Sequence, residues 1–436
     1  MNSFSNKSNN KLRAFFLSKN TDRFIFVLLL AIVFTGGLCE SLLTLSYKYI
    51  PSKAGERFYV DYNWAFVVVA VIILFYAIRE HFEGRKLPFD MTFLVLAQTM
   101  ILVAVIDYHN EQYSTLAYAW ILPASYLVGK MAVGFDKMEA DRRIEMVVYV
   151  FMVGLFILSM LDFWNLGKYA FCWTESWPGF FTGEDQNRCG MAMALFLVNT
   201  SIVYIWMKRN NNPIWYCIVE LMLVLSLCWS FKVESRTITL LPFLTIALVA
   251  MISLYDKRKR ISNIVWITCG VFFLFTILLI YIVYSFNLGD IKTAYRESSW
   301  GAGIFENDRF KMDIAGFKLM LQNPYGRLEP PANPLDSPHN TFLQYGRVYG
   351  MAIFVLVEVF RLLTIKDAVV MTVDNSASKI KYLLIPAFIC INMNFSLDPN
   401  GYIQRDLYMF ILFISGLISG WNDVQRYPSQ RFISTI

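Results

Sequence analysis

The chain has 436 residues, of which 56% are hydrophobic, 17% are aromatic and only 17% are charged. Soluble globular domains carry about a quarter charged residues, so this composition excludes an ordinary soluble protein. The net charge is +6, but the basic residues are spread over many loops. They therefore indicate orientation in a membrane rather than binding to nucleic acid.

Repeated apolar runs of about 17–25 residues predict an all-α, polytopic transmembrane helical bundle, which we treat as a single integral membrane domain over residues 1–436. The polar, basic N-terminal segment precedes a long apolar run without a small-residue cleavage site, which predicts an uncleaved first span. We expect about 12 spans, at residues 24–43, 63–79, 89–106, 114–133, 145–161, 189–207, 214–232, 237–255, 262–286, 341–363, 381–395 and 405–421.

The distribution of Lys and Arg predicts the orientation of these spans. Basic residues gather in the N-terminal segment and in alternate connections, most clearly in the short turn Asp256-Lys257-Arg258-Lys259-Arg260. By the positive-inside rule, both termini are cytoplasmic. The opposite, outer face carries three sizeable loops, 44–62, 162–188 and 287–340. We expect the chemistry there, because functional residues concentrate on loops that a rigid scaffold holds.

Two cysteines flank the second outer loop. Cys172 and Cys189 are separated by sixteen residues and could form a disulfide in an oxidising compartment. The alternative, that Cys189 already lies inside the sixth span, stays open.

The stretch from Arg309 to Gly350 contains the strongest candidate for catalysis. Its first part predicts an amphipathic outer helix, which Asn323-Pro324 ends. The helix has its apolar residues at Phe310, Ile314, Phe317 and Leu321.

A stiff, proline-rich segment follows and places Pro338-His339-Asn340 at the start of the next span. A neutral imidazole can accept a proton near pH 7, which makes His339 a candidate general base. The alternative is a histidine that merely hydrogen-bonds a neighbour at a helix start. His81 reads as a solvated surface residue, and no role is assigned to His109.

Several arginines on or near the outer face predict an anionic ligand. Arg236 stands in the tight outer connection between two spans, and Arg309 begins the amphipathic helix. Arginine binds phosphate through its planar guanidinium, which can donate two hydrogen bonds at once. The alternative is that an arginine at a membrane boundary extends its side chain to the membrane–water interface without binding a ligand. The other arginines on this face considered for substrate binding are Arg188, Arg327, Arg347 and Arg405.

Other signatures are missing from the sequence. It has no P-loop, no dinucleotide glycine fingerprint, no HExxH and no carboxylate cluster with metal-ligand spacing. Glu220 and Glu358 could line a proton or cation path, but we expect both near the cytoplasmic interface and assign them no role.

Three patches, taken in order, resemble the bacterial O-antigen ligase and O-antigen polymerase superfamily of GT-C type membrane glycosyltransferases. The first is Ser235-Arg236-Thr237 with the apolar run and basic turn after it. The second is Arg309 followed by Asn323-Pro324-Tyr325-Gly326. The third is His339-Asn340-Thr341-Phe342-Leu343 with Gly350. The resemblance covers about residues 183–421, and the first half matches only as a set of spans.

The resemblance implies a glycosyltransferase of the bacterial inner membrane with a periplasmic catalytic loop at residues 287–340. Its donor would be a glycan on a polyprenyl pyrophosphate, and its acceptor the lipid A–core in a ligase or a second lipid-linked unit in a polymerase. It implies neither a metal nor another cofactor. Arg236 and Arg309 would grip the pyrophosphate, His339 would act as the base, and Asn340 would orient it.

We favour the ligase over the polymerase by a small margin. A transporter or flippase for the same lipids, and a non-catalytic scaffold within a polysaccharide assembly complex, remain alternatives. The absence of a repeat and the gathering of polar groups on the outer face argue against a transporter, whose binding groups lie near the midplane.

Overall fold

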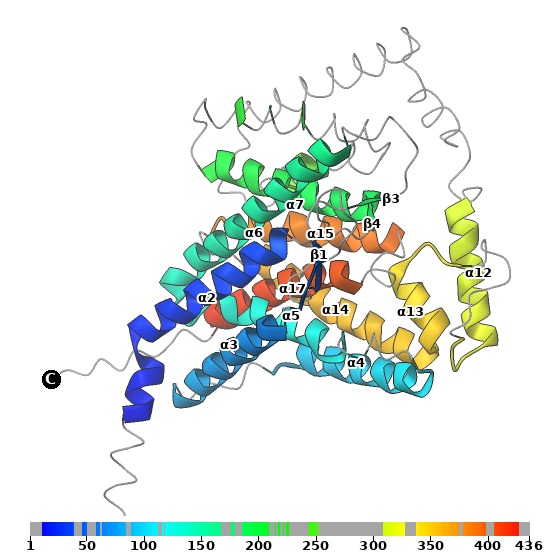
Figure 1. Cartoon of the computed structure of the whole chain (residues 1–436), viewed down its shortest axis with the longest axis horizontal. Coiled ribbons are helices and arrows are strands. Elements are labelled where there is room, and N and C mark those ends of the chain that lie inside the picture. The colour runs from blue at the N-terminus through cyan, green and yellow to red at the C-terminus, as the bar shows by residue number, and fades with distance from the viewer. Residues whose placement is uncertain are drawn as a thin grey trace, which may run out of the picture.

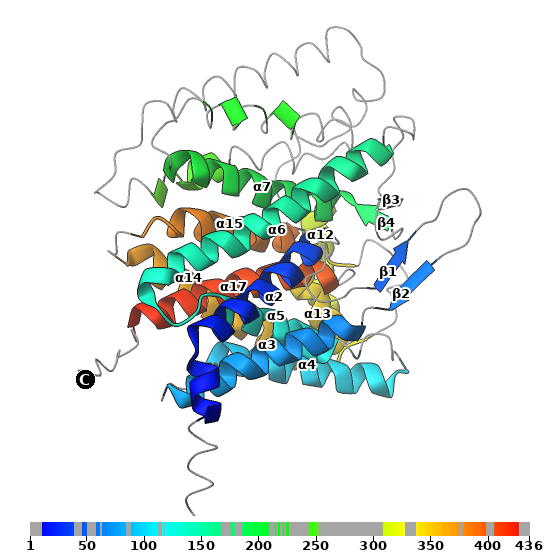
Figure 2. The same cartoon turned by 60° about the vertical axis from the view of Figure 1, so that its left-hand side comes forward.

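The protein is a bundle of helices with two short β-hairpins in a computed structural model (Figures 1 and 2). The structure describes residues 11–38, 46–49, 58–61, 63–83, 89–111, 116, 118–166, 176–178, 185–208, 214, 217–218, 221, 224–225, 244–249, 251–252, 308–327, 337–374, 378–397 and 405–426.

The elements follow one another in this order. The first half contains α2 (Lys19–Leu38), α3 (Asn63–Phe82), α4 (Met91–His109), α5 (Tyr118–Ala132), α6 (Lys137–Leu166) and α7 (Arg188–Lys208). The second half contains α12 (Asp308–Gln322), α13 (Thr341–Tyr349), α14 (Met351–Val373), α15 (Lys381–Leu397) and α17 (Arg405–Arg426). The antiparallel hairpins are β1 (Ser46–Tyr49) with β2 (Phe58–Asp61), and β3 (Ser176–Pro178) with β4 (Asp185–Asn187).

The predicted all-α class is confirmed. A helix occupies each expected span up to residue 207 and each one after residue 340, while the expected spans at 214–232, 237–255 and 262–286 lie largely or wholly outside the described residues. Among the described helices, three are long and apolar enough to cross a membrane, namely α2, α4 and the Lys137–Leu161 part of α6. The chain therefore has the helices of a membrane protein.

One expected span is wrong in its bounds. The sequence predicted a single helix over 341–363, but the chain forms two helices, α13 and α14, separated by Gly350. Gly350 has a φ of 97°, a conformation that glycine adopts at little cost and that ends a right-handed helix. Because Gly346 lies against Phe354 and Phe342 lies against Arg361, α13 runs back along the first turns of α14.

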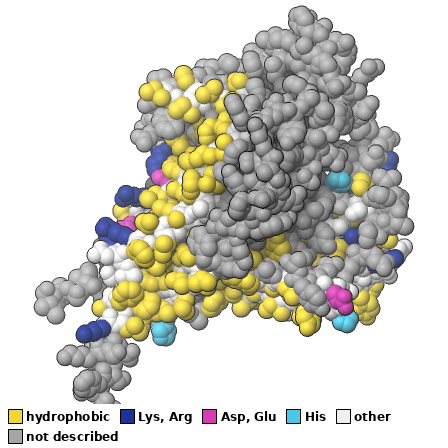
Figure 3. All heavy atoms as spheres, in the orientation of Figure 1, with side chains coloured by type: hydrophobic (Ala, Val, Ile, Leu, Met, Phe, Trp, Pro, Cys, Tyr) yellow, Lys and Arg dark blue, Asp and Glu magenta, His cyan; other side chains and the backbone are white. Residues whose placement is uncertain are grey.

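The outward-facing surface of the bundle is apolar. In Figure 3, hydrophobic side chains cover much of the visible described surface, and Lys and Arg side chains lie along its left-hand edge and at a few places near its right-hand edge. Val71 and Leu74 on α3, Val105 on α4, and Val355 and Leu362 on α14 are examples of large exposed apolar side chains. A broad exposed apolar area between charged ends suits a helix bundle that is surrounded by lipid.

Glycines allow two pairs of helices to pack backbone to backbone. A Cβ on Gly416 of α17 would collide with the carbonyl oxygen of Tyr126 on α5, and one on Gly420 would collide with that of Lys130. On the α2–α6 pair, a Cβ on Gly154 would come within 2.6 Å of the carbonyl oxygen of Phe34. Small residues four apart are a common means of close helix approach in membranes.

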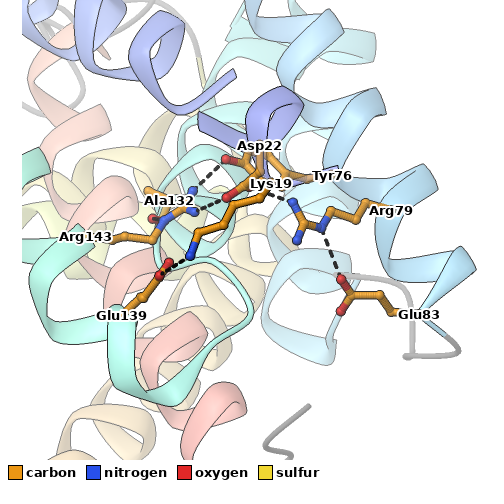
Figure 4. Close-up of polar contacts among 8 residues, drawn as sticks. All are labelled: Lys19, Asp22, Tyr76, Arg79, Glu83, Ala132, Glu139 and Arg143. Carbon is orange, nitrogen blue, oxygen red and sulfur yellow. Dashed lines mark hydrogen bonds and ion pairs between the residues drawn. The ribbon is translucent and has the colours of Figure 1, made fainter. Parts of the chain in front are cut away.

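Charged side chains lock one end of the bundle (Figure 4). Asp22 at the start of α2 pairs with Arg79 at the end of α3 and with Arg143 near the start of α6, each at 2.9 Å. Arg143 also donates to the hydroxyl of Tyr76 and to the carbonyl of Ala132. Since Asp22 and Arg143 are both buried, each needs its partner to offset the cost of leaving water.

Further polar contacts tie other helices into the same end. Lys130 at the end of α5 pairs with Asp90, which caps the start of α4, and with Asp423 at the end of α17. Asp141 near the start of α6 accepts from Trp421 of α17 and from Ser378, just before α15. The helix ends that the sequence assigned to one face therefore meet at one end of the bundle, as the predicted alternation of spans requires.

Candidate functional site

The turn that carries His339 lies between α12, α13 and the last turn of α15, and so far from the start of α15, where Ser378 contacts Asp141 at the charged end of the bundle. Pro338 is buried in this turn, and His339 is partly buried. A Cβ on Gly316 of α12 would lie 2.7 Å from the ring of Pro338, so α12 rests directly on the residue before the histidine. The stiff proline and the covering helix together restrict the backbone that presents the imidazole.

Asn340, the residue after the histidine, caps α13 and ties this turn to α15. Its Oδ1 accepts hydrogen bonds from the backbone N–H groups of Phe342 at 2.9 Å and Leu343 at 3.2 Å, which caps the start of α13. Its Nδ2 donates to the carbonyl oxygen of Ser396 on α15 at 3.1 Å. One side chain thus satisfies two N–H groups that a helix start leaves without partners and fixes the turn to a neighbouring helix.

The amphipathic helix expected after Arg309 is confirmed as α12, and the turn that ends it locks onto the break between α13 and α14. The carbonyl oxygen of Pro324 accepts from the backbone N–H of Met351 at 2.8 Å, and the carbonyl oxygen of Arg347 accepts from that of Arg327 at 3.0 Å. Gly326, with a φ of 85°, lies so close to this break that a side chain there would strike the backbone.

Two further contacts fix α13 from its other sides. The hydroxyl of Tyr349 donates to Asp107 near the end of α4 at 2.7 Å, with both residues buried. Met320 of α12 packs against Gly346 with no room for a Cβ between them. A helix of nine residues is marginal by itself, so these tertiary contacts hold α13 in its position.

Sequence reasoning missed Arg361. Its guanidinium lies 4.4 Å from the ring centre of Phe342, donates to the hydroxyl of Ser396 at 3.0 Å, and lies 3.5 Å from Glu358. Glu358 is therefore close to the His339 turn and lies well before the end of its helix, because α14 continues to Val373 rather than ending at residue 363 as expected. The available signal was an arginine within an apolar run, which is costly in a membrane and usually functional.

The other predicted arginines have varied placements. Arg347 is buried in α13, where its Nε donates to Gln344 at 3.2 Å, and Arg327 is exposed after the turn that ends α12. Arg236 and Cys172 lie outside the described residues. For four further predicted site residues, the structure describes the helical backbone but not the side chain. These residues are Arg188, Cys189, Arg309 and Arg405.

The described site thus brings together α12, the His339 turn, α13, α14 and α15. His339 lies on a turn that neighbouring helices hold in place, and the guanidinium of Arg361 lies on α14. In this arrangement the imidazole could accept a proton close to a bound anionic group. No protein-family model matches the chain, and no curated protein or solved structure is similar enough to count as a match.

Proposed function

We propose that the protein is an integral-membrane glycosyltransferase that moves a glycan from a polyprenyl pyrophosphate to a sugar hydroxyl. The observation that carries this proposal is the contact between two of the patches that resemble the O-antigen ligase and polymerase superfamily. The turn ending α12 bonds to the break after α13, and α12 itself rests on Pro338 beside His339. Segments that the resemblance only places in order along the chain thus form one packed unit.

In the proposed reaction, His339 takes the proton of the acceptor hydroxyl as its oxygen attacks the anomeric carbon of the donor. The bond from that carbon to the pyrophosphate oxygen breaks, and the electron pair leaves with the polyprenyl pyrophosphate. Arg236 and Arg309 would stabilise the negative charge that develops on this leaving group. The protein supplies orientation and a base, because the donor already contains a good leaving group.

The proposed setting is the bacterial inner membrane, with about 12 spans, both termini in the cytoplasm and the site in the periplasm. It is supported by the apolar helices and by the gathering of Asp22, Arg79, Lys130 and Arg143 at the end of the bundle opposite His339. We favour the ligase, with lipid A–core as the acceptor, over a polymerase that joins lipid-linked repeat units.

The test uses purified protein in detergent or liposomes with a polyprenyl-pyrophosphate glycan and either acceptor. His339→Ala is expected to lower transfer by about 10²–10⁴-fold, the range of general-base help. The matched control is His81→Ala, because His81 is exposed in the last turn of α3 and should leave transfer unchanged. Glycan on lipid A–core identifies a ligase, and elongated lipid-linked glycan identifies a polymerase.

Full transfer by a normally folded His339→Ala protein would exclude the proposed base. Movement of lipid-linked glycan across liposomes without a new glycosidic bond would instead favour a transporter. For the arginine, Arg236→Lys is the sharper change, since lysine keeps the charge but not the bidentate fork. Wild-type transfer by that variant would show that bidentate phosphate contact is not the role of Arg236.

A further inference from the structure

Arg361 occupies an unusual place for a cation. It lies ten residues after the first residue of α14, which is about 15 Å along a helix that rises 1.5 Å per residue. Its neighbours Val359 and Leu362 are exposed and apolar, whereas the Arg361 side chain is 28% exposed. A cation surrounded by such neighbours is costly in a lipid environment unless its partners hold it in the bundle.

The partners of Arg361 come from two other helices. Its Nη2 donates to Ser396 Oγ on α15 at 3.0 Å, and its guanidinium carbon lies 4.4 Å from the ring centre of Phe342 on α13. The ion pair with Glu358 is long, at 3.5 Å, and lies within α14. The contacts that reach beyond α14 therefore go to residues on either side of the His339 turn.

These contacts form a closed network of interactions around the His339 turn. Ser396, whose hydroxyl accepts from Arg361, also accepts through its carbonyl oxygen from Asn340. Asn340 in turn accepts from the backbone N–H of Phe342, whose aromatic ring lies beneath the guanidinium. Moving Arg361 would loosen both the α15 side and the α13 side of the segment that follows His339.

We propose that Arg361 is a positioning residue that holds the His339 turn in its working geometry. Arginine suits this position because its flat guanidinium can stack on an aromatic face while its edge donates a hydrogen bond in the same plane. Lysine offers a point charge and cannot make both contacts with the same geometry. The inference rests on the proposed function, in which His339 is the base.

The test compares Arg361→Gln and Arg361→Lys with the wild type in the same transfer assay. A small displacement of a catalytic group can cost about 10²-fold, so we expect Arg361→Gln to lower kcat by about that factor. KM should change by less than about threefold, because substrate contacts stay intact. Arg361→Lys should recover part of the rate. The matched control is Lys366→Gln, an exposed cation on the same helix, with no expected effect.

A second measurement reports on the turn without any substrate. Hydrogen exchange of the amides of Phe342 and Leu343 should become at least several-fold faster in Arg361→Gln. The variant lacks the contacts of Arg361 with Ser396 and Phe342, so local opening of the start of α13 costs less free energy. The amides in the buried middle of α5 should keep their exchange rates.

The outcomes separate this inference from the proposed function. If Arg361→Gln keeps wild-type kcat while His339→Ala is inactive, the positioning role is overturned and the proposed function stands. If kcat falls while exchange at Phe342 and Leu343 stays unchanged, the positioning role is again overturned, because Arg361 then acts on the substrate. Full activity of His339→Ala would remove the proposed function itself.

Discussion

The cap that Asn340 forms on α13 gives the sharpest prediction about the site. In Asn340→Ala, the two backbone N–H groups of Phe342 and Leu343 lose their acceptor, and the carbonyl oxygen of Ser396 loses its donor. Loss of a helix cap costs about 1 kcal/mol, and loss of one partly buried hydrogen bond costs about 1 kcal/mol. The start of α13 should therefore be less stable by about 2 kcal/mol.

Hydrogen exchange measures this change directly. Because about 1.4 kcal/mol corresponds to a factor of ten in an equilibrium constant, the amides of Phe342 and Leu343 should exchange about 30-fold faster in the variant if exchange follows local opening. Asn340→Asp keeps an acceptor for the cap but loses the amide donor to Ser396, so it should show a smaller effect.

The control is Asn110→Ala, because Asn110 also bonds a backbone carbonyl but at the exposed end of α4. It should leave the amides of α13 unaffected. Unchanged exchange at Phe342 and Leu343 in Asn340→Ala would refute the cap and with it the physical account of how the turn is held.

Two further predictions concern the bundle that carries the site. Gly416→Val should lower stability by about 1–3 kcal/mol or more, the range for overpacking, because its side chain would meet the backbone of Tyr126, which cannot move aside; the thermal unfolding midpoint in detergent measures this, and an unchanged midpoint would contradict the close packing of α5 and α17. Arg143→Gln should lower the free energy of unfolding by about 3–5 kcal/mol, because Asp22 stays buried without one of its cations. The double variant Arg143→Gln with Asp22→Asn should lose less stability than the sum of the two single variants. Strict additivity in that cycle would show that the pair is not coupled.

Local patterns in the sequence predicted the elements that carry the site. The helical spacing of Phe310, Ile314, Phe317 and Leu321 predicted a helix that begins at Arg309, and the structure has α12 at Asp308–Gln322. Asn323-Pro324 predicted its end. These signals are local, because helix period, caps and proline stops depend on residues a few positions apart. The basic residues in alternate connections between helices likewise predicted which helix ends lie together at one end of the bundle.

The tertiary structure alone decided how these elements surround the histidine. The sequence shows Gly350 within an apolar run, but only the packed chain shows that α13 folds back along α14 there. The reversal places Phe342 over Arg361 and brings Asn340 to Ser396, which is 56 residues away in the chain. Such contacts depend on the choice of helix neighbours across long stretches of chain, and a pattern with a period of 3.6 residues contains no information about that choice.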